Sequence, residues 1–135
     1  MSTVENPDLT LKTVDDKVTI IVDFDARFTH FERQLDDLGM KSHAHADVVP
    51  IDNGTDIGPT IVSFPTEPFD EIDTASSGDQ VIHKTLRLKV DRSTLQEDPD
   101  AGNADELKVK IRIHAPEAPV VFTDDVFTDQ EVLLG

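Results

Sequence analysis

Residues 17–29, KVTIIVDFDARFT, determine the fold of this chain. Successive side chains of a β-strand point to opposite faces of its sheet, so a strict alternation of polarity indicates a strand with one dry face. The polar members here are interrupted only by Ile21. The apolar members all have even numbers: Val18, Ile20, Val22, Phe24, Ala26 and Phe28. The stretch therefore predicts a long strand that is buried on one side.

Residues 107–115, LKVKIRIHA, repeat the pattern near the other end of the chain. Two half-buried strands so far apart in sequence favour a sheet protein with one shared core. Turn signals separate further extended stretches, and residues 1–7 are expected to form a loose leader. We expect these additional strands over residues 9–14, 40–51, 59–64 and 80–91, with a last strand formed by 119–123 and 129–134 and broken by Asp124-Asp125. Lys84 interrupts the apolar face of residues 80–91, which predicts that this end lies at the rim.

A change of period after residue 28 predicts one short helix near residues 30–38. Phe28, Phe31, Leu35 and Leu38 have the spacing of one helical face. Thr29 followed by Glu32 is a capping-box pattern, and Gly39 is a typical helix stop.

At the level of strand pattern, the chain resembles the immunoglobulin-like and fibronectin-III-like superfamily. It departs from that pattern by having no Cys, Trp or Tyr. The resemblance implies an all-β fold: one antiparallel sandwich of two sheets and about seven strands, with the helix as an insertion. No linker divides the 135 residues, so we expect residues 1–135 to be a single domain.

Acidic residues dominate the composition, with 28 Asp and Glu against 12 Lys and Arg and a formal charge of -16. Such a charge repels phosphate backbones and anionic lipid surfaces, so neither nucleic acid nor a membrane is an expected partner. An adaptation to a salt-rich environment would also explain so large an excess of acidic residues. The sequence has no signal-peptide pattern and no apolar run of a bilayer's length, which leaves the cytoplasm as the default location and the true compartment open.

The histidine motif His43-Ala44-His45-Ala46-Asp47 is the strongest candidate for a metal site. Positions i, i+2 and i+4 of a strand share a face, so both imidazoles and the carboxylate of Asp47 would point the same way, as ligands of zinc do. His30, His83 and His114 are possible third ligands if the fold brings them near. The simpler interpretation is a solvent-facing strand surface.

The acidic stretch over residues 97–106 is a candidate calcium loop. Asp98, Asp100, Asn103 and Asp105 supply the oxygen ligands that calcium prefers. A solvated hairpin rich in Asp is the simpler alternative.

The sequence favours a non-enzymatic β-sandwich module that acts through its surface, in a structural, assembly or protein-binding role. A protein partner or a second copy is the expected ligand, and no cofactor is predicted. The alternatives are a metal-binding protein or metalloenzyme that uses His43, His45 and Asp47, and a calcium-dependent binding module.

Overall fold

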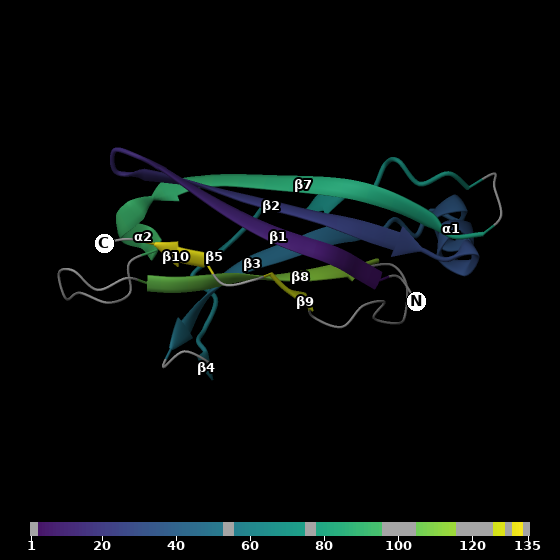
Figure 1. Ribbon diagram of the computed structural model, residues 1–135. Coiled ribbons are helices and arrows are strands. Elements are labelled where there is room, and N and C mark those ends of the chain that lie inside the picture. The colour runs from purple at the N-terminus through teal and green to yellow at the C-terminus, as the bar shows by residue number, and fades with distance from the viewer. Residues whose placement is uncertain are drawn as a thin grey trace.

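The computed structural model describes residues 3–52, 56–74, 78–95, 105–115, 126–128 and 131–133 (Figure 1). Strands predominate in these residues, together with two helices. In chain order, the elements are β1 (Thr3–Val14), β2 (Lys17–Phe28), α1 (His30–Asp37), β3 (His43–Asp52), β4 (Asp56–Ile57), β5 (Val62–Ser63), β6 (Glu67–Pro68), β7 (Gln80–Asp91), α2 (Arg92–Leu95), β8 (Asp105–His114), β9 (Val126–Phe127) and β10 (Glu131–Leu133).

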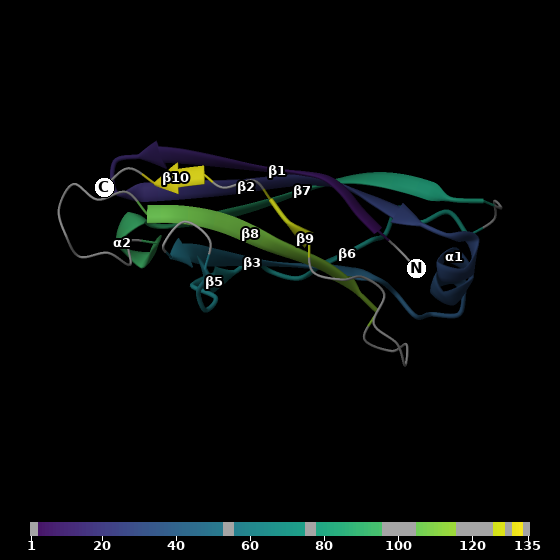
Figure 2. The ribbon, with the colours of Figure 1, turned by 60° about the horizontal axis from the view of Figure 1, so that its bottom comes forward.

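The long strands form two antiparallel sheets that face one another, with β1, β2 and β7 in one layer and β3 and β8 in the other (Figures 1 and 2). The first sheet has the order β1-β2-β7. In the second sheet, β8 lies between β10 and β3. The short strands β4, β5 and β6 pair with β3, and β9 pairs with β8. The predicted two-sheet, mainly β architecture is confirmed.

The core lies between the two sheets and follows the predicted alternation. All six even-numbered residues of β2 from Val18 to Phe28 are completely buried. From the other sheet, Leu107, Val109, Ile111 and Ile113 of β8 are equally buried. Complete burial of a Val, Leu, Ile or Phe side chain contributes about 1.5–3 kcal/mol relative to exposure, so this shared interior is the main stabilising feature of the fold.

The loose leader expected over residues 1–7 is instead a strand from Thr3 onward. Thr3 and Glu5 pair with Arg27 and Asp25 of β2. The register then shifts between Glu5 and Asp8, where Asn6 has a positive φ of 51°. This β-bulge allows both Val4 and Leu9 to point into the core although their numbers differ in parity.

Three other boundaries differ from the sequence prediction. The strand expected over 59–64 is reduced to Val62–Ser63, and a further two-residue strand, Glu67–Pro68, lies between it and β7. α2 follows β7 directly, and β8 begins at Asp105, two residues before the expected strand over 107–115. The first part of the expected last strand, 119–123, lies outside the described residues, whereas Glu131–Leu133 falls within its second part, 129–134.

β7 has the predicted bounds, but Lys84 is not at a rim. Only 9% of its surface is exposed, and it points inward between Ile82 and Leu86. Its Nζ donates to the Pro68 carbonyl at 3.0 Å and to Glu71 Oε1 at 3.3 Å. The same Nζ is 5.1 Å from the centre of the Phe69 ring. Lys84 is tolerated inside because a carbonyl, a carboxylate and an aromatic face surround its charge.

Helix α1 begins as predicted. Thr29 Oγ1 accepts from the Glu32 amide, and Glu32 Oε1 accepts from the Thr29 amide at 3.0 Å. Gly39 follows the helix with a φ of 90°. Only half of the predicted face packs inward: Phe28 is completely buried and Leu35 packs against Ala115, whereas Phe31 and Leu38 are 64% and 72% exposed.

The buried residues of α1 are Glu32 and Arg33 instead. Glu32 is held inside by its cap. Arg33 Nε donates to the Asp73 carbonyl at 2.6 Å, and its Nη1 donates to the Gly78 carbonyl at 2.7 Å. Hydrogen bonds to a distant loop therefore set the orientation of this helix. They hold it across the end of the sandwich where β2 ends and β7 begins (Figures 1 and 2).

The described chain starts and finishes at opposite ends of the long axis. Thr3 pairs with Arg27 near α1. Leu133 pairs with Asp105, and β8 runs from there back toward α1, where His114 pairs with His43.

Candidate functional site

The histidine motif occupies the first half of β3, on the face that points away from the core. Ala44, Ala46 and Val48 are buried against the other sheet. The side chains between them are partly exposed: His43, His45 and Asp47. The motif therefore lies on the outer face of the second sheet.

Strand β8 supplies the neighbours of the motif. The antiparallel register places His114 opposite His43, Arg112 opposite His45 and Lys110 opposite Asp47. The rings of His45 and His114 approach to 5.8 Å between centroids, at an interplanar angle of 56°. Three of the five histidines of the chain thus gather on two adjacent strands.

Asp47 is engaged with groups other than the imidazoles. Ser63 Oγ, from β5, donates to Asp47 Oδ1 at 2.6 Å. Lys110 Nζ lies 4.0 Å from Asp47 Oδ2. Within the described ranges, no three His, Asp or Glu side chains form a group that could hold a metal ion as they stand. The structure brings His114 to the motif, and it does not bring His30 or His83.

Two imidazole nitrogens of this face are buried without a hydrogen-bond partner, namely His43 Nδ1 and His45 Nε2. Burial lowers the pKa of His45 below 6.5, and the positive Arg112 next to it acts in the same direction. Both effects disfavour the charged form of His45, which has one ring nitrogen directed into the protein surface.

The candidate calcium residues Asp98, Asp100 and Asn103 lie outside the described residues. Asp105 is the first residue of β8, and its side chain also lies outside the description.

The sequence did not indicate a second cluster, which lies on the outer face of the first sheet around His83 of β7. Its Nδ1 is 2.9 Å from Asp25 Oδ1 and its Nε2 is 3.3 Å from Asp23 Oδ1, so the ring bridges two carboxylates of β2. Asn6 Nδ2 donates to Asp25 Oδ2 at 3.0 Å, and Thr85 Oγ1 donates to Asp23. The hydrogen bond that the His83 ring donates to Asp25 raises the pKa of His83 above 6.5. The sequence signal for this cluster was the presence of Asp23 and Asp25 on the polar face of the strand predicted over residues 17–29.

Comparison of the chain with models of protein families, with curated proteins and with solved structures finds no match. Neither of the two helices in the described part of the chain has the length and apolar character required to cross a bilayer.

Proposed function

We propose that this protein is a non-enzymatic, immunoglobulin-like β-sandwich module that binds an acidic protein partner on the outer face of β3 and β8. The observation that carries the proposal is the gathering of cationic and imidazole side chains on this face. We call it the basic face and define it by six residues: His43, His45, Lys108, Lys110, Arg112 and His114.

Strand order supports the immunoglobulin-like assignment. In that architecture strands A, B, D and E share one sheet, and strands C, F and G share the other. With the short strands β4, β5, β6 and β9 set aside, the remaining strands correspond to A, B and E in the first sheet and to C, F and G in the second, and the first sheet as described has no counterpart of strand D. β1, β2 and β7 form one sheet, and β3, β8 and β10 form the other.

The charge of the basic face contrasts with that of the whole chain. Three of the 12 Lys and Arg and three of the five His stand on it, within a protein of charge -16. Lys110 is close to Asp47. Within the described residues, neither Lys108 nor Arg112 has a carboxylate at ion-pair distance. Asp47 and Glu106 lie on the same outer face, so the formal charge of that face is +1 with its histidines neutral, against -16 for the whole chain. A positive face on an acidic protein gives orientation and specificity to association with a partner of the opposite sign.

Features of the sheet edges favour a face over an edge as the binding surface. β1 carries the bulge at Asn6 and Pro7, and the proline has no amide to donate to an added strand. β7 carries the inward charge of Lys84, which is a common protection of an edge strand against pairing.

A polyglutamate peptide of about 20 residues tests the proposal by titration calorimetry at about 0.15 M salt, where distant charges are largely screened. The test variant is Lys108→Gln with Arg112→Gln, which removes two charges from the basic face. The matched control is Lys12→Gln with Lys89→Gln, which removes two exposed charges from the other sheet. We expect the first variant to lose binding at least tenfold and the control to retain it.

Three outcomes would overturn the proposal. They are a wild-type protein that fails to bind the peptide, an equal loss of binding in both variants, and a single-stranded oligonucleotide that binds the basic face in preference to polyglutamate. Equal losses would mean that the attraction is a diffuse charge effect and that no dedicated surface exists.

A zinc or copper site on the same strands is a second candidate, favoured by the approach of His114 to His45. His114 would replace Asp47 as the third ligand beside His43 and His45, after rotation of the rings toward one another. Metal titration of protein purified without a histidine tag tests this idea. His114→Ala should abolish binding of one equivalent of metal and Asp47→Asn should not. Equal binding by both variants would eliminate the site.

A further inference from the structure

The outer face of the first sheet is built of six cross-strand rows, each with one residue from β1, β2 and β7. Antiparallel pairing of both neighbours with β2 fixes these rows. From the β1–β2 hairpin toward α1 they are Val14, Lys17 and Asp91; Lys12, Thr19 and Lys89; Thr10, Ile21 and Arg87; Asp8, Asp23 and Thr85; Glu5, Asp25 and His83; and Thr3, Arg27 and Val81.

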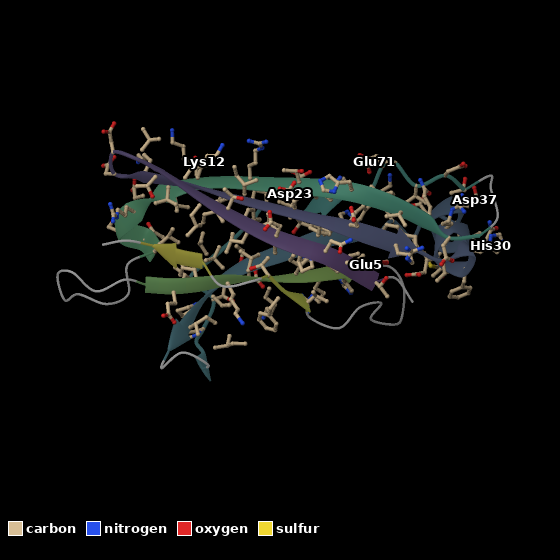
Figure 3. The ribbon with its side chains drawn as sticks, in the orientation of Figure 1. Glu5, Lys12, Asp23, His30, Asp37 and Glu71 are labelled. Carbon is tan, nitrogen blue, oxygen red and sulfur yellow. The ribbon has the colours of Figure 1, made fainter. Side chains whose placement is uncertain are left out.

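Charge divides this face into two halves of opposite sign. The three rows nearest the hairpin, which we call the hairpin half, hold four cations and one carboxylate: Lys12, Lys17, Arg87, Lys89 and Asp91. The three rows nearest α1, which we call the acidic half, hold four carboxylates and one guanidinium: Glu5, Asp8, Asp23, Asp25 and Arg27. The formal charges are thus +3 and -3 with His83 neutral. Figure 3 shows Lys12 toward the hairpin, and Asp23 and Glu5 nearer α1.

The charges inside each half are only partly neutralised. Lys17 bonds to Asp91, and Arg27 bonds to Glu5 at 2.6 Å. Within the described residues, Lys12, Arg87 and Lys89 have no carboxylate at ion-pair distance. These three exposed cations stand near one another on a chain in which acids outnumber bases by more than two to one. The hairpin half therefore has unused positive charge.

We propose that two copies of the chain associate face to face through this sheet, about a two-fold axis that lies in the interface, parallel to the rows and between the Ile21 row and the Asp23 row. An isologous contact of this kind sets each surface against itself in reverse. The Lys12 row of one copy then lies over the Glu5 row of the other, and the same contact is repeated on the far side of the axis. The inference concerns a different surface from the basic face and stands independently of it.

The dimensions of the face set the strength of the contact. Twelve residues at about 3.4 Å each and three strands about 4.8 Å apart give roughly 600 Å² per copy. The total of about 1,200 Å² is at the lower limit for a stable specific interface. The facing side chains are mostly polar, and the two copies repel one another through their net charge. We therefore expect a weak dimer that depends on ionic strength.

Sedimentation equilibrium of the wild-type protein tests the inference, over concentrations from about 10 µM to about 1 mM. At about 0.15 M salt, screening over ~8 Å suppresses the overall repulsion more than it suppresses the contacting pairs. At about 1 M salt the screening length is ~3 Å and the contacting pairs weaken as well. We expect dimer at the lower salt concentration and monomer at the higher one.

A charge-swap experiment then identifies the surface. Lys12→Glu with Lys89→Glu gives the hairpin half negative charge, and Glu5→Lys with Asp8→Lys gives the acidic half positive charge. Each variant alone should remain monomeric, because like charges now face one another. An equimolar mixture should recover the dimer, because each altered half then faces its complement. The matched control is Lys108→Glu with Arg112→Glu, which changes the net charge equally on the other sheet and should leave dimerisation unchanged.

The inference is overturned if the wild-type protein is monomeric at every concentration, if the control variant loses the dimer, or if the mixture stays monomeric. Recovery in the mixture also shows that both variants are folded. If either variant fails to fold, the wild-type salt dependence decides: a dimer that persists in about 1 M salt contradicts a contact made by charge. A monomeric wild-type protein leaves polyglutamate binding at the basic face unaffected, so the two proposals fail separately.

Discussion

The imidazole Nδ1 of His83 in β7 lies 2.9 Å from Oδ1 of Asp25 in β2, a residue 58 positions earlier in the sequence. This contact makes His83 the histidine with a raised pKa, and it lowers the pKa of Asp25 in return. His83 is 61% exposed, so the contact responds to solution pH without unfolding of the protein.

The free energy of unfolding should carry a signature of this contact. The folded state holds the His83 proton more tightly than the unfolded chain does, so the contribution is complete below about pH 6.5 and disappears as the pH rises through the folded pKa. His83→Gln should therefore cost more stability at about pH 5.5 than at about pH 8.5, a range in which Asp25 stays ionised. Urea denaturation measures the difference. Titration of the His83 ring by NMR should also give a lower pKa in Asp25→Asn, and an equal cost at both pH values would contradict the assignment.

Arg33→Met should destabilise the fold by about 2–4 kcal/mol. The side chain is buried, and its replacement removes two charge-assisted hydrogen bonds to the carbonyls of Asp73 and Gly78. Arg87→Met is the matched control, since Arg87 is exposed and its loss should change stability by no more than about 0.5 kcal/mol. Urea midpoints compare the two. Similar midpoints would show that α1 is not held by these bonds.

Truncation to alanine should lower stability strongly at one phenylalanine of the α1 region and hardly at all at another. Phe28 is completely buried, and its ring meets Phe69 edge-on at 4.9 Å between centroids, so Phe28→Ala should cost about 3–5 kcal/mol. Phe31 is 64% exposed, and Phe31→Ala should change the free energy of unfolding by less than about 0.5 kcal/mol. Thermal or urea denaturation checks both values. A large cost at Phe31 would mean that the apolar face of α1 packs inward, as the spacing alone predicted.

Lys84→Met should leave stability within about 1 kcal/mol of the wild type and make the protein more prone to aggregate. Glu71 is 52% exposed, so its carboxylate is hydrated when the lysine is lost, and a methionine of similar length fills the same space. The β7 edge, however, loses the inward charge that discourages added strands. Urea denaturation and turbidity on heating measure the two effects. A loss above about 2 kcal/mol with unchanged turbidity would reverse this interpretation.

The strands of the core could be predicted from sequence because one-sided burial imposes a period of two over many residues. The alternation in β2 and β8 needs no knowledge of remote partners. β1 was only partly predicted, because the bulge places Val4 and Leu9 on one face although they are five residues apart. A pattern of strict parity does not detect that insertion.

The remaining features depend on residues far apart in the chain. Helix spacing alone predicts that Phe31 points inward. Arg33 takes the inward position because it donates to carbonyl groups 40 and 45 residues later in the chain, which local spacing does not reveal. Lys84 similarly finds its carbonyl 16 residues earlier. His114 joins His43, and His83 joins Asp25, only through strand registers that the sequence does not specify. Sequence therefore located the His43 motif on a strand face, whereas the neighbours that define its chemistry required the paired strand.

Thr3 opens β1 at one end of the molecule and Leu133 closes β10 at the other, so tension applied between these two residues runs lengthwise along the strands. Such a load is shared by all the backbone bonds between β1 and β2 together, whereas a sideways pull would unzip them one after another. The positions of Thr3 and Leu133 thus give the sandwich mechanical resistance to a pull along its long axis.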